Sequence, residues 1–129
     1  MVIDSSVLIA ILLQEEDASQ YAQKLLETEQ VFISAVSVVE ASMVIEHKKG
    51  ELGAIKFDEL MQLIDPIVIA FDTQQAKLAR KAWRTYGKGR HPAKLNFGDC
   101  CSYAAAQHSN MALLFKGYDF SQTDIPSAL

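Results

Sequence analysis

The chain has 129 residues and a net charge of −4, and half of its residues are apolar. This length is typical of one domain with one core, so we expect a single domain over residues 1–129. The longest apolar run, Val7–Leu13, is far shorter than the roughly 20 residues of a membrane helix, and no basic residue precedes it as in a secretory signal. We therefore expect a cytoplasmic protein without a membrane segment. The adjacent Cys100 and Cys101 cannot join distant segments, and we expect both to be reduced.

Apolar periodicity and capping residues predict short strands that alternate with helices. We expect strands at residues 2–3, 31–33, 67–71 and 112–115, and a candidate edge strand at 124–125. Between the first two strands we expect helices at 7–13, capped by Ser6, and at 18–27; between the second and third, helices at 37–49, ended by Gly50, and at 55–64. Between the third and fourth strands we expect a helix at 73–86, capped by Asp72 or Thr73, and a helix from Asn96 or Gly98 to His108. This order predicts an α/β fold in three layers, with a central parallel sheet of four to five short strands and helices on both faces.

Four acidic residues lie where such a sheet binds ligands, beyond the carboxyl ends of the strands. Asp4 ends the first strand, Glu40 follows the second, and Asp119 follows the fourth. Asp99 opens the helix that leads to the fourth strand. The topology therefore predicts one acidic cluster, in which the position of Asp99 depends most on the fold.

Each acid also has a purely structural interpretation. Asp4 is a good helix cap, and Glu40 fits a Ser37-x-x-Glu40 capping box. Asp99 suits the first turn of a helix, and Asp119 suits a turn. Taken singly, each acid is better explained by structure than by catalysis.

Together the four acids indicate a metal site. Two carboxylates ~6 Å apart repel by about 3 kcal/mol at an effective dielectric near 20, so a cluster needs protons or a cation. Oxygen ligands without His or Cys favour Mg²⁺ or Mn²⁺. Such an ion activates water for phosphodiester hydrolysis, in a one-metal or a two-metal arrangement.

A basic segment precedes Asp99. Residues 73–98 contain no acid but hold seven of the twelve basic residues. Lys77 and Lys81 are expected on a solvated helix face, and Trp83 is expected in the core. We expect Arg84, Lys88, Arg90 and Lys94, which are nearer Asp99, to contact the phosphates of a polyanionic substrate.

At these residues the sequence resembles the PIN-domain proteins, and among them the VapC toxins of bacterial type II toxin–antitoxin pairs. The matching segments are Val2–Leu8, Ile33–Glu40, Leu95–Cys100 and Leu114–Phe120, the last followed by Thr123–Ile125. Leu-Asn-Phe-Gly-Asp followed by Phe-Lys-Gly-x-Asp-Phe is the most specific part. Tyr118 departs from the pattern, because family members often carry Asn there.

The resemblance implies a PIN fold, Mg²⁺- or Mn²⁺-dependent endoribonuclease activity, and inhibition by a cognate VapB-type antitoxin. It assigns catalytic roles to Asp4, Glu40, Asp99 and Asp119, with Asp4 and Asp99 as the direct metal ligands. Ser5, Ser6 and Asp124 would support them by orienting carboxylates or waters.

The apolar run Val7–Leu13 has two interpretations: a fully buried helix, or a surface for an antitoxin helix or a homodimer contact. The resemblance favours the second interpretation, and we expect a homodimer.

The sequence does not distinguish a nuclease that cuts RNA from one that also cuts DNA at the same site. Two functions of other classes also remain open. One is a catalytically silent PIN-like module that only binds a partner. The other is a phosphorelay receiver domain, in which Asp72 and Lys116 would be the phosphoacceptor and the lysine. Receivers carry an acidic pair after the first strand, whereas serines follow Asp4 here.

Overall fold

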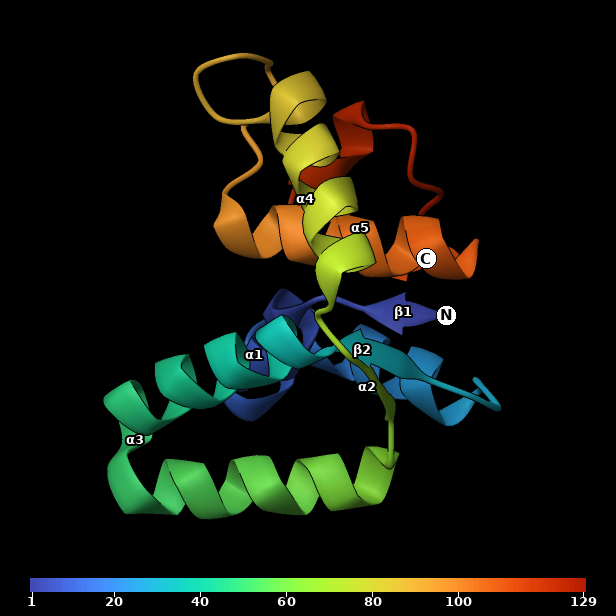
Figure 1. Cartoon of the computed structure of the whole chain (residues 1–129). Helices are drawn as coiled ribbons and strands as arrows, with labels where there is room; N and C mark the ends of the chain where they lie inside the picture. The colour runs from blue at the N-terminus through green and yellow to red at the C-terminus, as the bar shows by residue number, and fades with distance from the viewer.

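Four short parallel strands form the centre of the computed structural model, which describes residues 1–129 (Figure 1). They are β1 (Val2–Ile3), β2 (Phe32–Ser34), β3 (Ile67–Ile69) and β4 (Leu113–Leu114), in the spatial order β3-β2-β1-β4. The helices are α1 (Ser5–Leu12), α2 (Ala18–Leu26), α3 (Ala35–Ile64), α4 (Thr73–Tyr86), α5 (Phe97–Ser109) and the 3₁₀ turn η1 (Asp119–Gln122). The predicted α/β class and parallel sheet are confirmed.

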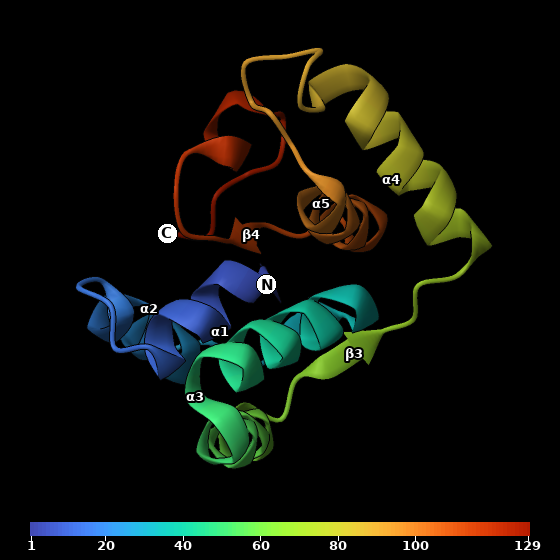
Figure 2. The same ribbon diagram turned by 90° about the vertical axis from the view of Figure 1, so that its left-hand side faces the viewer.

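Alternation along the strands divides the core into two parts. Val2 and Leu113 point to the face covered by α4 and α5. Ile3 and Leu114, the next residue of each strand, pack on α1 and α3 at the opposite face. Figure 2 shows these two helical layers on either side of the sheet. The fold therefore has the predicted three layers.

Several predicted boundaries are wrong because a different residue caps the helix. α1 begins at Ser5, because the side chain of Asp4 rather than Ser6 accepts the first hydrogen bond. α3 begins at Ala35, because Ser34 accepts from the N–H of Val36. The capping box predicted for Ser37 does not form.

Gly50 divides α3 instead of ending it before a loop. Its φ of 64° and ψ of −150° make a sharp bend, after which the second helical segment begins at once. The predicted gap between residues 50 and 55 is therefore absent. The candidate edge strand at 124–125 is also absent, and Ser127 only forms an isolated bridge with Leu113.

Helix α1 is mainly a core helix. Val7, Leu8 and Ala10 are buried on the sheet, whereas Ile11 lines a surface groove between α1, α2 and the second half of α3. The buried interpretation of Val7–Leu13 thus holds for three of its seven residues, and the other four are half-buried. No helix is long and apolar enough to span a membrane.

Candidate active site

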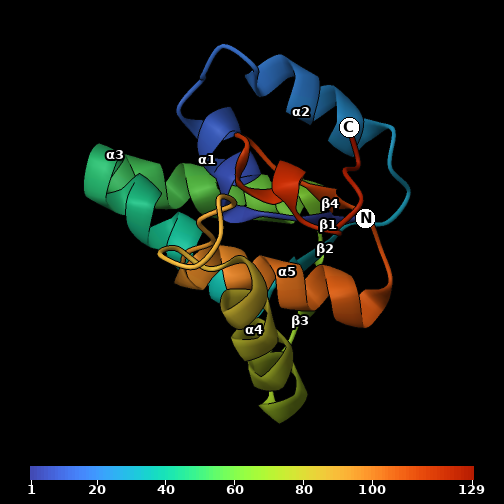
Figure 3. The ribbon, with the colours of Figure 1, turned by 90° about the horizontal axis from the view of Figure 1, so that it is seen from above.

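Helices α1, α3 and α5 begin close together at the carboxyl edge of the sheet. The hydroxyl of Ser5, in α1, donates to Oε1 of Glu40, in α3, at 2.5 Å. The hydroxyl of Ser102, in α5, donates to Oδ1 of Asp4 at 2.5 Å. Seen from above, α5 lies against the sheet, and α4 crosses α5 and projects outward from it (Figure 3). These contacts bring together residues that are up to 98 positions apart in the chain.

Asp4 caps α1 and also lies in the predicted acidic cluster, so the structural interpretation does not exclude the other one. Asp4 is only 4% exposed, and its Oδ2 accepts from the backbone N–H of Ser6 at 3.1 Å, which caps α1. Its other oxygen faces α5 through the bond to Ser102. Capping therefore fixes the carboxylate at the site edge instead of removing it from the site.

Asp99 is the acid that the surroundings perturb most. Its side chain accepts from the N–H of Asn96 at 3.0 Å, and the N–H of Asp99 donates to the Asn96 side chain at 2.9 Å, which completes a capping box. The pKa of Asp99 is raised to about 7, and burial of the carboxyl group is the largest cause. The hydrogen bond from Asn96 lowers this pKa, whereas the negative charges of Asp4, Asp119 and Glu40 raise it further. The four predicted acids therefore interact through their charges.

Glu40 is pressed against the start of α5. A Cβ on residue 98 would overlap the Glu40 carboxylate, so any other residue there would force the Glu40 side chain to move. The structure thus explains Gly98 in the sequence Leu-Asn-Phe-Gly-Asp: it lets the first turn of α5 approach Glu40.

Asp119 and the supporting residues differ in their surroundings. Asp119 is exposed at the start of η1. Its loop is fastened to α1, because Ser6 Oγ accepts from the N–H of Lys116 at 3.0 Å. Asp124 accepts from the hydroxyl of Tyr103 at 2.7 Å, so that contact directs it to α5.

Sequence reasoning missed two buried serines. Ser37 and Ser102 are fully buried, and their hydroxyl oxygens are 3.0 Å apart. The available signal for Ser102 is its position three residues after Asp99, because residues three apart lie on the same helix face. No signal in the sequence links Ser37 to Ser102 or to Asp4.

The carboxylates fit a hydrated hard cation. No three His, Cys, Asp or Glu side chains stand close enough to hold a metal ion by themselves. Mg²⁺ does not need such a cage, because it is usually bound by one or two carboxylates, with water and substrate phosphate as its other ligands. Asp4 and Asp99 offer that donor set. Burial is the main reason why the pKa of Asp99 is raised, and the negative charges of Asp4, Asp119 and Glu40 raise it further.

The basic segment is free to meet a polyanion. Both ion pairs of the chain involve Lys116, with Glu15 and Asp17, so no basic residue of 73–98 has an acidic partner within 4.0 Å. The predicted RNA contacts are all exposed and occupy the end of α4 and the loop that leads to α5: Arg84, Lys88, Arg90 and Lys94.

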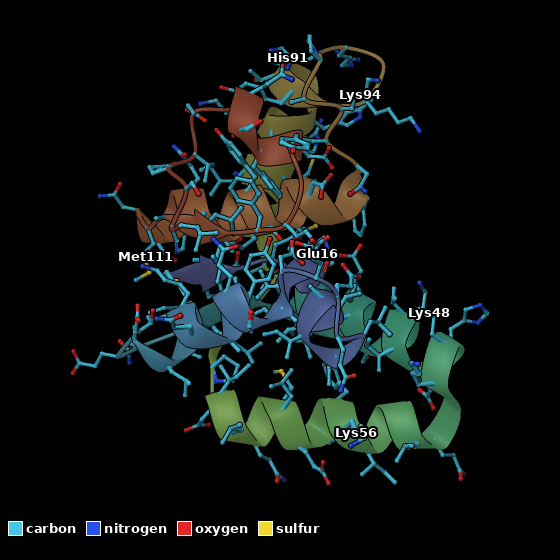
Figure 4. The ribbon with its side chains drawn as sticks, turned by 180° about the vertical axis from the view of Figure 1, so that it is seen from behind. Glu16, Lys48, Lys56, His91, Lys94 and Met111 are labelled. Atoms are coloured by element: carbon cyan, nitrogen blue, oxygen red, sulfur yellow. The ribbon has the colours of Figure 1, made fainter.

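That loop lies at the opposite end of the molecule from Lys48 and Lys56. Figure 4 shows His91 and Lys94 at one end of the molecule, and Lys48 and Lys56 on α3 beyond the sheet. The expectation that Trp83 is a core residue is wrong: it is 44% exposed, and the guanidinium of Arg90 lies 4.1 Å from its ring centre.

This architecture, with acids at the carboxyl edge of a four-stranded parallel sheet, matches a known class. A PIN domain model matches residues 1–126, and the chain belongs to the PIN-domain family.

The relatives within that family carry VapC names, which confirms the resemblance stated from the motifs. Ribonuclease VapC30 of Mycobacterium tuberculosis is 44% identical over 126 residues, which cover 97% of this chain and 95% of the relative. Ribonuclease VapC of Mycolicibacterium smegmatis is 44% identical over 125 residues, or 97% of each chain.

Solved structures share the fold at low identity. The crystal structure of VapC20 of M. tuberculosis, described as a toxin that cleaves the sarcin-ricin loop, has a TM-score of 0.78 at 15% identity and covers 96% of this chain and 95% of that one. A toxin–antitoxin complex from Klebsiella pneumoniae has a TM-score of 0.72 at 18% identity, with 99% and 97% covered.

The receiver interpretation is wrong. Besides the family match, Asp72 is occupied in capping α4, where it accepts from the N–H of Gln75 at 2.9 Å. Lys116 is held by Glu15 and Asp17, in the loop between α1 and α2.

Proposed function

We propose that this protein is a Mg²⁺- or Mn²⁺-dependent endoribonuclease and the toxin of a VapBC-type pair. The observation that carries the proposal is the gathering of acids at one edge of the sheet. Ser102 of α5 bonds to Asp4 at 2.5 Å, and Gly98 packs against Glu40. The charges of Asp4, Asp119 and Glu40 add to burial in raising the pKa of Asp99. In a PIN-domain chain with VapC ribonucleases as relatives, a metal site for RNA cleavage is the best account of such a cluster.

Asp4 and Asp99 would hold the ion. When bound, the ion would supply a reactive water and offset charge on the leaving oxygen. Two hydrogen bonds fix the Asp4 carboxylate in the orientation in which it would bind the ion, and Asp99 would bind it in its deprotonated form. Glu40, held by Ser5, and Asp119 would orient water around the ion, with Ser6 holding the loop of Asp119 in place.

The RNA backbone would lie along the exposed basic side chains between α4 and α5. They carry no intramolecular ion pair, so contact with phosphates breaks none. Phosphate contacts of this kind position RNA without reading its sequence.

Two apolar surfaces suit the expected protein partners. The groove between α1, α2 and the second half of α3 exposes Leu26 and Leu63 and would accept an apolar antitoxin helix.

The first half of α3 exposes Val39 and Met43 beside Phe97, and this patch would form the homodimer contact. A Met43→Glu variant should then be monomeric in light scattering; an unchanged dimer would place the contact elsewhere. The cytoplasmic location stays a prediction.

The decisive experiment is cleavage of a mixed RNA panel with Mg²⁺ or Mn²⁺, repeated with EDTA. Asp99→Asn should abolish cleavage, whereas Asp58→Asn, an exposed acid on α3, should not alter it. Activity that persists in EDTA, or a fully active Asp99→Asn protein, would refute the proposal. Inactivity of the folded wild type on every RNA would favour the silent binding module, and a matching DNA panel would show whether DNA is also cut.

A further inference from the structure

The buried hydroxyls of Ser37 and Ser102 form a short chain that ends on Asp4. Ser37 Oγ is 3.0 Å from Ser102 Oγ, which is 2.5 Å from Asp4 Oδ1. Both serines are fully buried, and Asp4 is 4% exposed. Three elements, α3, α5 and the end of β1, each contribute one member.

The bond to Asp4 sets the direction of the protons in this chain. The hydroxyl of Ser102 donates to Asp4 Oδ1, so its single proton points to Asp4. The oxygen of Ser102 is then left as an acceptor, and Ser37 must donate to it. Donation from Ser37 polarises the hydroxyl of Ser102 and strengthens its bond to the carboxylate.

The chain also restricts what Asp4 is able to bind. Each carboxylate oxygen accepts one hydrogen bond, Oδ1 from Ser102 and Oδ2 from the N–H of Ser6. Because the two donors belong to α5 and α1, rotation of the carboxylate about its last bond would break both bonds. The remaining lone pair on each oxygen is therefore held in one direction.

We propose that Ser102 is a positioning residue for the metal site, and that Ser37 supports it by fixing the direction of its proton. The inference rests on the proposed function, because it concerns the cation that Asp4 would hold. Groups behind metal ligands typically alter metal affinity by about 10–100-fold when they are removed. A purely structural role, in which the two serines only satisfy each other in the core, predicts a change in stability but none in affinity.

The test measures Mn²⁺ binding to the full-length protein without RNA, by titration calorimetry or by the electron paramagnetic resonance of free Mn²⁺. Ser102→Ala should raise the Kd for Mn²⁺ by about tenfold or more, and Ser37→Ala should raise it by less. Ser109→Ala is the matched control, because this serine is on the same helix and makes no hydrogen bond through its side chain. Ser102→Cys keeps a weak donor of similar size and should fall between the wild type and Ser102→Ala.

Each result decides one of two questions. If the wild type does not bind Mn²⁺, both the proposed function and this inference fail. If the wild type binds, and Ser102→Ala melts at a lower temperature but binds with an unchanged Kd, the serines are structural and only this inference fails. If Ser102→Ala does not fold, an unchanged Kd in Ser102→Cys and Ser37→Ala also overturns it. An ordered loss of affinity over the three variants, with Ser109→Ala unchanged, supports it.

Discussion

Neutralising Asp99 should stabilise the metal-free protein above pH 7. The raised pKa means that, between pH 4 and pH 7, the folded chain keeps a proton that the unfolded chain has released. Stability therefore falls as the pH rises through this window, and the full penalty is present above the folded pKa of about 7. Asp99→Asn removes the charge, and its amide oxygen still accepts the N–H of Asn96.

The size of the effect follows from the shift. Raising the pKa from 3.8 to about 7 corresponds to about 4 kcal/mol, at 1.36 kcal/mol for each pKa unit. Asp99 is only partly buried, so solvent screening reduces this figure, and we expect about 2 kcal/mol. The variant should thus exceed the wild type by that amount at pH 8 in EDTA, and the two should converge near pH 4.

Urea unfolding, followed by circular dichroism at both pH values, measures this difference. Mg²⁺ should reverse the order, because the wild type gains about 2.7 kcal/mol at an ion concentration 100 times its Kd and the variant gains less. Equal stability of the two proteins at pH 8 in EDTA would refute the reasoning. A gap that does not depend on pH would also refute it, because an uncharged packing effect would then be the cause.

Three further predictions concern the same edge of the sheet. Asp4→Asn should abolish RNA cleavage. Its melting temperature should stay equal or rise, because the amide can still cap α1 and donate to Ser102. A collapsed fold would show that the cap alone mattered. Gly98→Ala should cost about 1–3 kcal/mol of stability by overlap with Glu40 and should greatly slow cleavage, as urea unfolding and an RNA assay would show; wild-type stability would contradict the close contact. Replacing both Lys88 and Lys94 with Gln should weaken RNA binding and reduce the salt slope by about 1–2, measured by fluorescence anisotropy; an unchanged slope would exclude them as phosphate contacts.

The fold was predictable where local signals agree. Asp72 caps α4 and Asn96 caps α5, and each is one of the two candidates that the sequence offered, since each cap depends on bonds within three residues. At α3 the local signal misled, because Ser34 and Ser37 are both plausible caps. Ser37 instead points into the core, where Ser102 offers a partner 65 residues away.

The site was predictable as a set of acids but not as a set of contacts. Strand ends identified Asp4, Glu40 and Asp119, because topology alone places them at one edge. The bond from Ser102 to Asp4 and the packing of Gly98 on Glu40 depend on how α5 lies against α1 and α3. Such packing involves side chains far apart in sequence, and no short pattern encodes it.

The structural and catalytic interpretations of the acids are not alternatives, because the helix starts make the cluster tolerable. Asp4 caps α1 and Asp99 lies in the first turn of α5, so the positive ends of two helices face the acids. Each helix end supplies roughly half a positive charge, hence about one in total against four carboxylates. The compensation is incomplete, because the charges of Asp4, Asp119 and Glu40 still add to burial, the largest cause, in raising the pKa of Asp99. The remaining charge must be met by a proton or by a cation, and at neutral pH a divalent cation would meet it while leaving all four carboxylates ionised.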